Sequence, residues 1–124
     1  MTIKVGFFFE LDDQAFVSTL ESLRRAEADP KEARILAYLG AGAACGVVPM
    51  LEEDLVEKPS TPIGVPELVT DGEYVWPTTL CYYVKKYHIA LPDEFVRHMR
   101  ANGWKVPQGI DGNAVKWEGE TQIG

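Results

Sequence analysis

Histidine and cysteine are scarce in this chain, which has two of each among its 124 residues. The positions of His88, His98, Cys45 and Cys81 do not reproduce the short ligand spacings of zinc sites. Cys81 and His88 would lie two turns apart on one predicted helix, too far for a nucleophile–base pair. The sequence therefore indicates no catalytic constellation, no metal site and no cofactor. We expect both cysteines to be free thiols in apolar surroundings rather than a disulfide.

Long hydrophobic runs are also missing. No segment approaches the roughly 20 apolar residues that span a bilayer, and the N-terminus lacks the features of a secretory signal. Both observations favour a cytoplasmic protein that does not enter a membrane. Basic clusters are missing as well: the net charge is −7, whereas phosphate backbones are bound by grouped Lys and Arg. Nucleic acid is therefore not an expected partner.

Acidic residues, in contrast, are abundant and concentrate in the stretches Glu10–Asp13 and Glu52–Glu57. An acidic surface keeps a protein in solution, and this role alone would account for the charge. The same surface also attracts a basic partner and speeds its encounter. A basic protein is therefore the class of partner that the charge favours.

Length and hydrophobic content indicate one globular domain, since 46% of the residues are hydrophobic. The β-branched and aromatic run Ile3–Phe9 predicts a largely buried strand, and Val47–Met50 is expected to be a connector or a short strand. Asp-Gly at 71–72 between apolar segments predicts a β-hairpin, because both turn residues can adopt positive φ. We expect a single α+β domain over 1–107, a mainly antiparallel sheet with several short helices packed on it. Residues 108–124 are expected to form a mobile tail.

Helix starts are marked by capping residues, and helix bodies by the spacing of apolar residues along one face. The predicted starts are Asp12 or Asp13, Asp29-Pro30, Pro77 followed by Thr78 or Thr79, and Leu91-Pro92. The segment Lys58–Pro66 is rich in proline and is expected to be a surface loop.

Aromatic residues gather in the hairpin and in the helix after it: Tyr74, Trp76, Tyr82, Tyr83 and Tyr87. Successive helical residues point about 100° apart, so the three tyrosines of the helix cannot all be buried on one face. At least one aromatic is expected at the surface or in a cleft, where Tyr and Trp are common binding anchors. Alternatively, the rings are packed internally with their polar ends in water.

The segment Thr70–Phe95 follows the pattern T-D-G-x-Y-V-W-P-x-x-L-x-Y-Y-V-x-K-Y-x-x-x-L-P-x-E-F. With K-V-G-F-F-F-E-L-D at 4–12 and Tyr38-Leu39-Gly40, it resembles a family of small bacterial proteins that has no assigned activity. Members of that family are similar to the immunity proteins encoded beside bacterial toxins. The resemblance implies a small acidic protein that binds another protein, and it transfers no catalytic residue.

These observations predict a non-enzymatic protein-binding module, in its specific form an immunity-type inhibitor that neutralises a bacterial toxin with a basic surface. The predicted anchors are Tyr74, Trp76, Tyr82 and Tyr87, and the predicted charged rim is Glu52, Glu53 and Asp54. Two alternatives remain open. One is a small enzyme or ligand-binding protein with a cleft beside the Tyr82–His88 helix, using Asp12, Asp13 or His88. The other is a homo-oligomer held together by the same aromatic residues.

Overall fold

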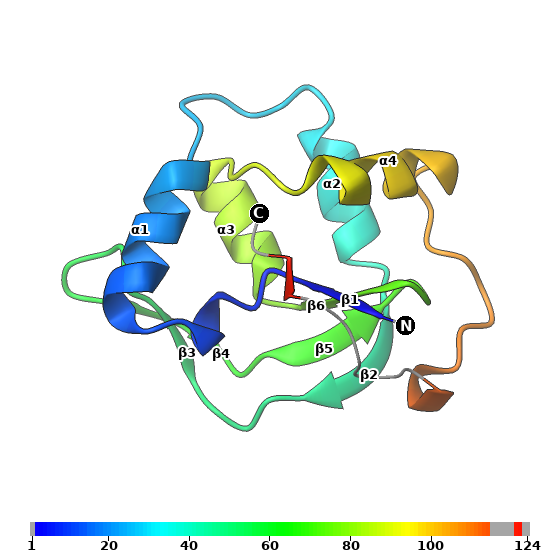
Figure 1. The fold of residues 1–124 in the computed structure, drawn as a ribbon, viewed down its shortest axis with the longest axis horizontal. Coiled ribbons are helices and arrows are strands. Elements are labelled where there is room, and N and C mark those ends of the chain that lie inside the picture. The colour runs from blue at the N-terminus through cyan, green and yellow to red at the C-terminus, as the bar shows by residue number, and fades with distance from the viewer. Residues whose placement is uncertain (1, 115–120, 123–124) are drawn as a thin grey trace.

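The computed structural model describes residues 2–114 and 121–122 (Figure 1). The strands are β1 (Ile3–Val5), β2 (Ala43–Val47), β3 (Glu52–Asp54), β4 (Thr61–Gly64), β5 (Glu67–Thr70), β6 (Tyr74–Pro77) and β7 (Thr121–Gln122). The α-helices are α1 (Asp13–Leu23), α2 (Glu32–Leu39), α3 (Leu80–Tyr87) and α4 (Asp93–Ala101), and the short 3-10 helices are η1 (Phe8–Glu10) and η2 (Gly112–Ala114). The chain is a single small α+β domain with a mainly antiparallel sheet, as predicted.

Two sheets are present in the described residues. The larger has the strand order β2-β5-β6-β1-β7, and the smaller contains β3 and β4 only. Strands β2, β5 and β6 are antiparallel neighbours, whereas β1 is parallel to both β6 and β7. The four α-helices lie along one side of the large sheet (Figure 1).

The predicted hairpin is confirmed between β5 and β6, where Thr70 pairs with Val75. Side chains build its turn. Asp71 Oδ1 accepts the backbone N–H groups of Glu73 and Tyr74 at 2.9 and 2.7 Å. Gly72 has a φ of +102°, a conformation that glycine adopts without strain. The Asp-Gly signal therefore specifies the turn through both its residues.

The predicted helix starts hold for α1, α3 and α4, whose N-caps are Asp12, Thr79 and Pro92. Asp12 caps α1 by accepting the Ala15 N–H at 2.9 Å. The start predicted at Asp29-Pro30 is early, because Asp29 accepts the Lys31 N–H in a turn and α2 begins at Glu32. Helix α3 buries the predicted face: Leu80, Tyr83, Val84 and Tyr87. The main core lies between these helices and the sheet, with Trp76 at its centre.

Three predictions about the first part of the fold are wrong. The strand expected over Ile3–Phe9 ends at Val5, because the chain turns at Gly6, whose φ is +75°. A Cβ there would be 2.7 Å from a methyl group of Leu80, so only glycine fits. Of the two alternatives for Val47–Met50, the strand is wrong and the connector holds: the strand lies earlier, at β2, and Pro49 lacks the N–H that a ladder needs. The expected loop Lys58–Pro66 contains β4.

The segment expected to be a mobile tail contains two ordered contacts. Helix η2 lies against β2, and Gly112 approaches the Ala44 carbonyl so closely that a side chain would not fit. Strand β7 pairs with β1. Residues 115–120 and 123–124 of the predicted tail lie outside the described residues.

Two further observations concern the sequence predictions. Cys45 and Cys81 are both free thiols, as expected. Within the described ranges, the helices are too short or too polar to cross a bilayer.

Candidate partner-binding surface

The predicted aromatic anchors do not form a surface. Tyr74, Trp76 and Tyr87 are buried, and only Tyr82 is partly exposed. Trp76 Nε1 donates a hydrogen bond to the Leu39 carbonyl at 2.9 Å. The Tyr74 ring stacks on Phe95 of α4, with 4.5 Å between ring centroids. The expectation of an exposed position is therefore corrected for three of the four aromatics. Tyr38 of α2 and Phe95 of α4 cover the rings of β6, and Tyr87 turns inward to Asp54.

The predicted acidic rim is divided between the core and the surface. Strand β3 alternates, so that Glu52 and Asp54 point inward while Glu53 is exposed. Glu52 and Asp54 are as buried as the apolar core, at 1% and 0% exposure. The expected rim position is corrected for these two carboxylates, and Glu53 alone has the surface position that was predicted.

Hydroxyl groups of α3 and its N-cap surround the two buried carboxylates. Glu52 accepts hydrogen bonds from Thr79 Oγ1 at 2.6 Å and from the Tyr83 hydroxyl. Asp54 accepts hydrogen bonds from the hydroxyls of Tyr87 and Tyr82 at 2.6 and 2.8 Å. Such contacts satisfy groups whose burial would otherwise be costly. They dock the small β3–β4 sheet onto α3.

The two carboxylates have opposite electrostatic environments. Burial raises the pKa of Glu52, and the hydroxyls of Thr79 and Tyr83 offset only part of that effect. Burial also disfavours ionisation of Asp54, but the hydroxyls of Tyr87 and Tyr82 outweigh it and lower the pKa of that carboxyl. The Val56 backbone N–H and the Lys86 ammonium, which lies 3.5 Å from Oδ2, also lower the pKa of Asp54. Asp54 is thus the stronger acid of the pair.

Sequence reasoning missed this network, although a signal for it was present. Two acids at alternate positions of a strand point to the same face. Tyr83 and Tyr87 recur at the i, i+4 spacing that places both hydroxyls on one helical face. Without a predicted strand over Glu52–Asp54, the sequence favours surface charge for these acids.

An apolar patch occupies the place where the two sheets meet. The exposed large hydrophobic residues of the described chain are Val47, Met50, Leu51 and Val65, which are 59, 40, 55 and 53% exposed. They form the apolar patch. The patch lies on two connecting segments, from β2 to β3 and from β4 to β5. These segments lie side by side, because the Val48 N–H donates to the Pro66 carbonyl at 2.9 Å and Glu52 pairs with Gly64. Residues far apart in the sequence thus lie on neighbouring segments of the chain.

A groove begins at this patch. It has a volume of about 240 Å³ and passes between β3 and the segment that leads into α1. Its lining is apolar at Phe9, Leu11, Met50, Leu51 and Leu55. Asp13 and Glu53 also line it, and both are exposed. The groove therefore combines an apolar floor with carboxylates at its border.

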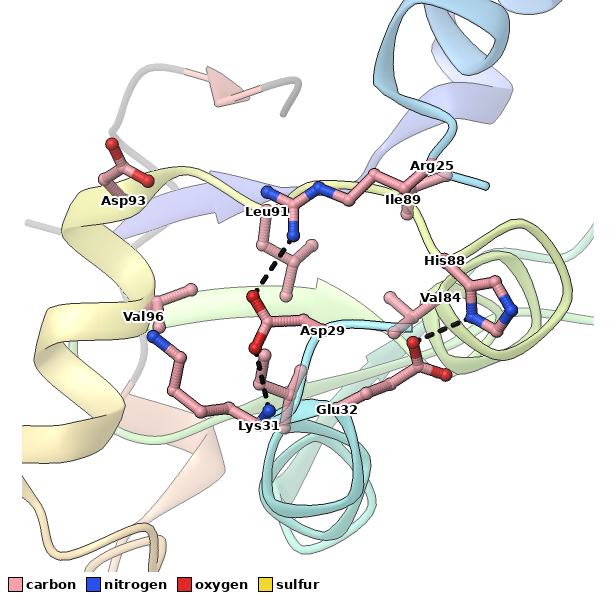
Figure 2. Close-up of a pocket in the computed structure, with 11 residues that line it drawn as sticks. Arg25, Asp29, Lys31, Glu32, Val84, His88, Ile89, Leu91, Asp93 and Val96 are labelled. Carbon is pink, nitrogen blue, oxygen red and sulfur yellow. Dashed lines mark hydrogen bonds and ion pairs between the residues drawn. The ribbon is translucent and has the colours of Figure 1, made fainter. Parts of the chain in front are cut away.

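A smaller cavity of about 70 Å³ lies among the helix ends (Figure 2). Polar contacts occupy its polar groups: Arg25 forms an ion pair with Asp29 at 3.2 Å, and His88 Nδ1 lies 2.8 Å from Glu32 Oε2. The Lys31 N–H also bonds to Asp29 and is the main cause of the lowered pKa of that carboxyl. His88 lies here, whereas Asp13 lines the groove. The structure does not bring these candidate residues into one site.

His98 belongs to a third cluster, around the hairpin turn. Its Nε2 lies 3.0 Å from the buried Oδ2 of Asp71, and its Nδ1 lies 3.4 Å from Glu73. The Tyr38 hydroxyl donates to the same Asp71 oxygen at 2.6 Å. Burial, followed by this bond, raises the pKa of Tyr38. Both ring nitrogens of His98 therefore face carboxylates, and the cluster joins the turn to α2 and α4.

Comparisons with protein-family models, with curated proteins and with solved structures find no match for this chain. Among the residues that the structure describes, no group of three or more His, Cys, Asp or Glu is arranged to hold a metal ion.

Proposed function

We propose that this chain is a protein-binding module that holds a basic protein on the apolar patch and its acidic border. The observation that carries the proposal is the gathering of the exposed large hydrophobic residues at one junction of the fold. Scattered exposed hydrophobics need no explanation, whereas a contiguous patch is typical of an interaction surface.

The chemistry of the border supports a basic partner. Interfaces commonly have an apolar centre and a polar rim, and the rim charges govern encounter and specificity more than affinity. Here Glu53 and Asp13 line the groove beside Leu51 and Met50, and the chain has a net charge of −7. A cationic surface with an apolar protrusion would complement both features.

The specific form of the proposal is an immunity-type inhibitor that neutralises a bacterial toxin in the cytoplasm without catalysing a reaction. The resemblance of Thr70–Phe95 to proteins of that kind supports this form. The structure changes the residues to which binding is assigned. Leu51 and Met50 take the place of the buried aromatics Tyr74, Trp76 and Tyr87. Of the predicted rim only Glu53 is kept, since Glu52 and Asp54 are buried.

The test begins with a photo-crosslinking amino acid at position 51 in cells that contain the natural partner, with position 33 of α2 as the control. Both positions are exposed, but only position 51 belongs to the apolar patch. A protein captured from position 51 and not from position 33 is then purified for affinity measurements.

With that protein, we expect Leu51→Ser to weaken binding by about tenfold or more, as truncation of an anchor does. Glu53→Lys should slow association, mostly at low salt. The matched controls are Ala33→Ser and Glu27→Lys, which change exposed residues outside the patch. Unchanged affinity in both patch variants would refute the proposal.

One observation favours a second candidate function, the binding of a small molecule in the cavity of Figure 2. His88 at its edge has a φ of +52°, and strained residues of this kind concentrate at functional sites. Ligand-observed NMR with a library of small amino acids and amines tests it. Binding that Glu32→Gln abolishes and Leu51→Ser leaves intact would favour this candidate over the protein-binding module.

A further inference from the structure

We propose that the partner contributes an extended segment, which adds to the free edge of β3 as a third strand of the small sheet. This inference depends on the proposed function and specifies how the partner is held. It assigns the groove beside β3 as the binding site for that segment.

The free edge of β3 faces the groove. In the described residues β3 pairs with β4 only, so one of its edges has no neighbouring strand. The groove is lined by Glu52 and Glu53 of β3 but by no residue of β4, and its opposite wall is Phe9, Leu11 and Asp13. It therefore lies on the side of β3 away from β4. An unpaired edge presents backbone N–H and C=O groups that an added strand can satisfy.

The edge is held in place before any partner arrives. Glu52 and Asp54, on either side of Glu53, are fixed by hydrogen bonds to hydroxyl groups of Thr79, Tyr82, Tyr83 and Tyr87. A fixed strand loses little conformational freedom when a segment pairs with it, which favours binding. The buried carboxylates thus support the edge rather than contact the partner.

Charge selects the occupant of the groove. A second copy of this edge would bring Glu53 against an acidic strand, and like charges opposite each other destabilise strand pairing. A segment in which Lys or Arg alternates with aliphatic residues would fit instead. Its cations would pair with Glu53 and Asp13, and its apolar side chains would contact the apolar lining of the groove at Phe9, Leu11 and Leu55. The carboxylates of Glu53 and Asp13 thus disfavour pairing between two copies of this edge and favour the binding of a basic segment.

The probe for this inference is an octapeptide that alternates lysine and valine. Its control has the same sequence and charge but N-methyl groups on all amides, which removes every backbone donor. NMR spectroscopy of the isotope-labelled full chain measures the affinity of each peptide and the exchange of amide protons over residues 51–55. We expect the methylated peptide to bind at least about tenfold more weakly, which corresponds to a loss of about 1.4 kcal/mol in binding free energy.

We also expect the unmethylated peptide to slow amide exchange in β3 and to give intermolecular Hα contacts to it. Glu53→Lys should abolish both effects, whereas Glu27→Lys, on an exposed residue outside the groove, should not. Equal binding of the two peptides without protection of β3 would overturn strand addition, and so would absence of binding by the unmethylated peptide. Either result leaves the patch proposal to be judged separately, by the Leu51→Ser and cross-linking measurements on the natural partner.

Discussion

The Tyr87 hydroxyl donates a 2.6 Å hydrogen bond to Asp54 Oδ2, although 33 positions of sequence separate the two residues. One turn earlier on the same helix, Tyr83 makes the equivalent bond to Glu52. The small sheet that bears the proposed interface is thus fastened to α3 by polar contacts inside the fold. Because buried polar groups are costly when unpaired, each of these bonds has a measurable effect on stability.

Tyr87→Phe should destabilise the protein by about 1.5–3 kcal/mol, the range for hydrogen bonds to charged groups. The ring remains, so the change removes the hydroxyl and leaves Asp54 with one donor fewer. Urea unfolding monitored by circular dichroism gives the free energy of unfolding. Tyr82→Phe is the matched control, since Tyr82 also donates to Asp54 but is partly exposed, and water can replace it. A loss no larger for Tyr87→Phe than for Tyr82→Phe would contradict the assignment.

Replacing the two buried carboxylates should have opposite pH dependences. Asp54 has a lowered pKa in the folded state, so its ionised form stabilises the fold above the ordinary value of 3.8. That contribution is lost as the pH falls through the folded pKa. The destabilisation caused by Asp54→Asn should therefore grow as the pH rises from the folded pKa to about 3.8 and stay constant above that value.

Glu52 has a raised pKa in the folded state, so folding favours its protonated form. The stability that it contributes is present below the ordinary value of 4.5 and declines as the pH rises through the folded pKa. The destabilisation caused by Glu52→Gln should therefore shrink over that interval. Urea unfolding at a series of pH values measures both differences. Parallel trends for the two variants would show that the carboxylates do not differ in this way.

Local signals specified much of this fold. The Asp71-Gly72 turn, the Asp12 cap and the buried face of α3 are set by residues close together in sequence, and all three were predictable. The ends of β1 and the existence of β3 and β4 depend on distant contacts. The chain turns at Gly6 with a φ of +75°, against Leu80, which leaves no room for a side chain there. A strand of sequence Glu-Glu-Asp forms because Tyr83 and Tyr87 satisfy its inward carboxylates.

The candidate site was harder to predict than the fold for the same reason. Residue type suggested that Trp76 is an anchor and Glu52 a surface charge, but burial depends on which elements close over them. Helix α4 covers β6, and the hairpin of β3 and β4 turns its acids inward. The apolar patch combines Leu51 and Val65, which no local pattern relates. Only the pairing of Glu52 with Gly64 places them together.

Trp76→Phe separates stability from binding. The change removes the hydrogen bond to the Leu39 carbonyl and leaves a cavity, so it should destabilise the protein by about 2–4 kcal/mol. Affinity for the partner captured at position 51 should be unchanged in the fraction that remains folded. Trp104→Phe, at a partly exposed residue, is the control and should cost well under half as much. If Trp76→Phe weakens the complex and leaves the free energy of unfolding unchanged, Trp76 contacts the partner after all.

His88 offers a test of backbone strain. It caps α3 in the left-handed region, with φ at +52°, where a residue with a Cβ is disfavoured by about 1–2 kcal/mol. His88→Ala and His88→Gly both lose the contact with Glu32, so the difference between them reports the backbone alone. We expect the glycine variant to be more stable by about 1 kcal/mol, because relief of strain exceeds the added freedom of the unfolded chain.

Lys85, exposed within α3, is the matched position. There the order should reverse, with alanine more stable by about 1 kcal/mol, since glycine is unfavourable inside a helix. If urea unfolding gives the same order at both positions, the left-handed cap at His88 is incorrect.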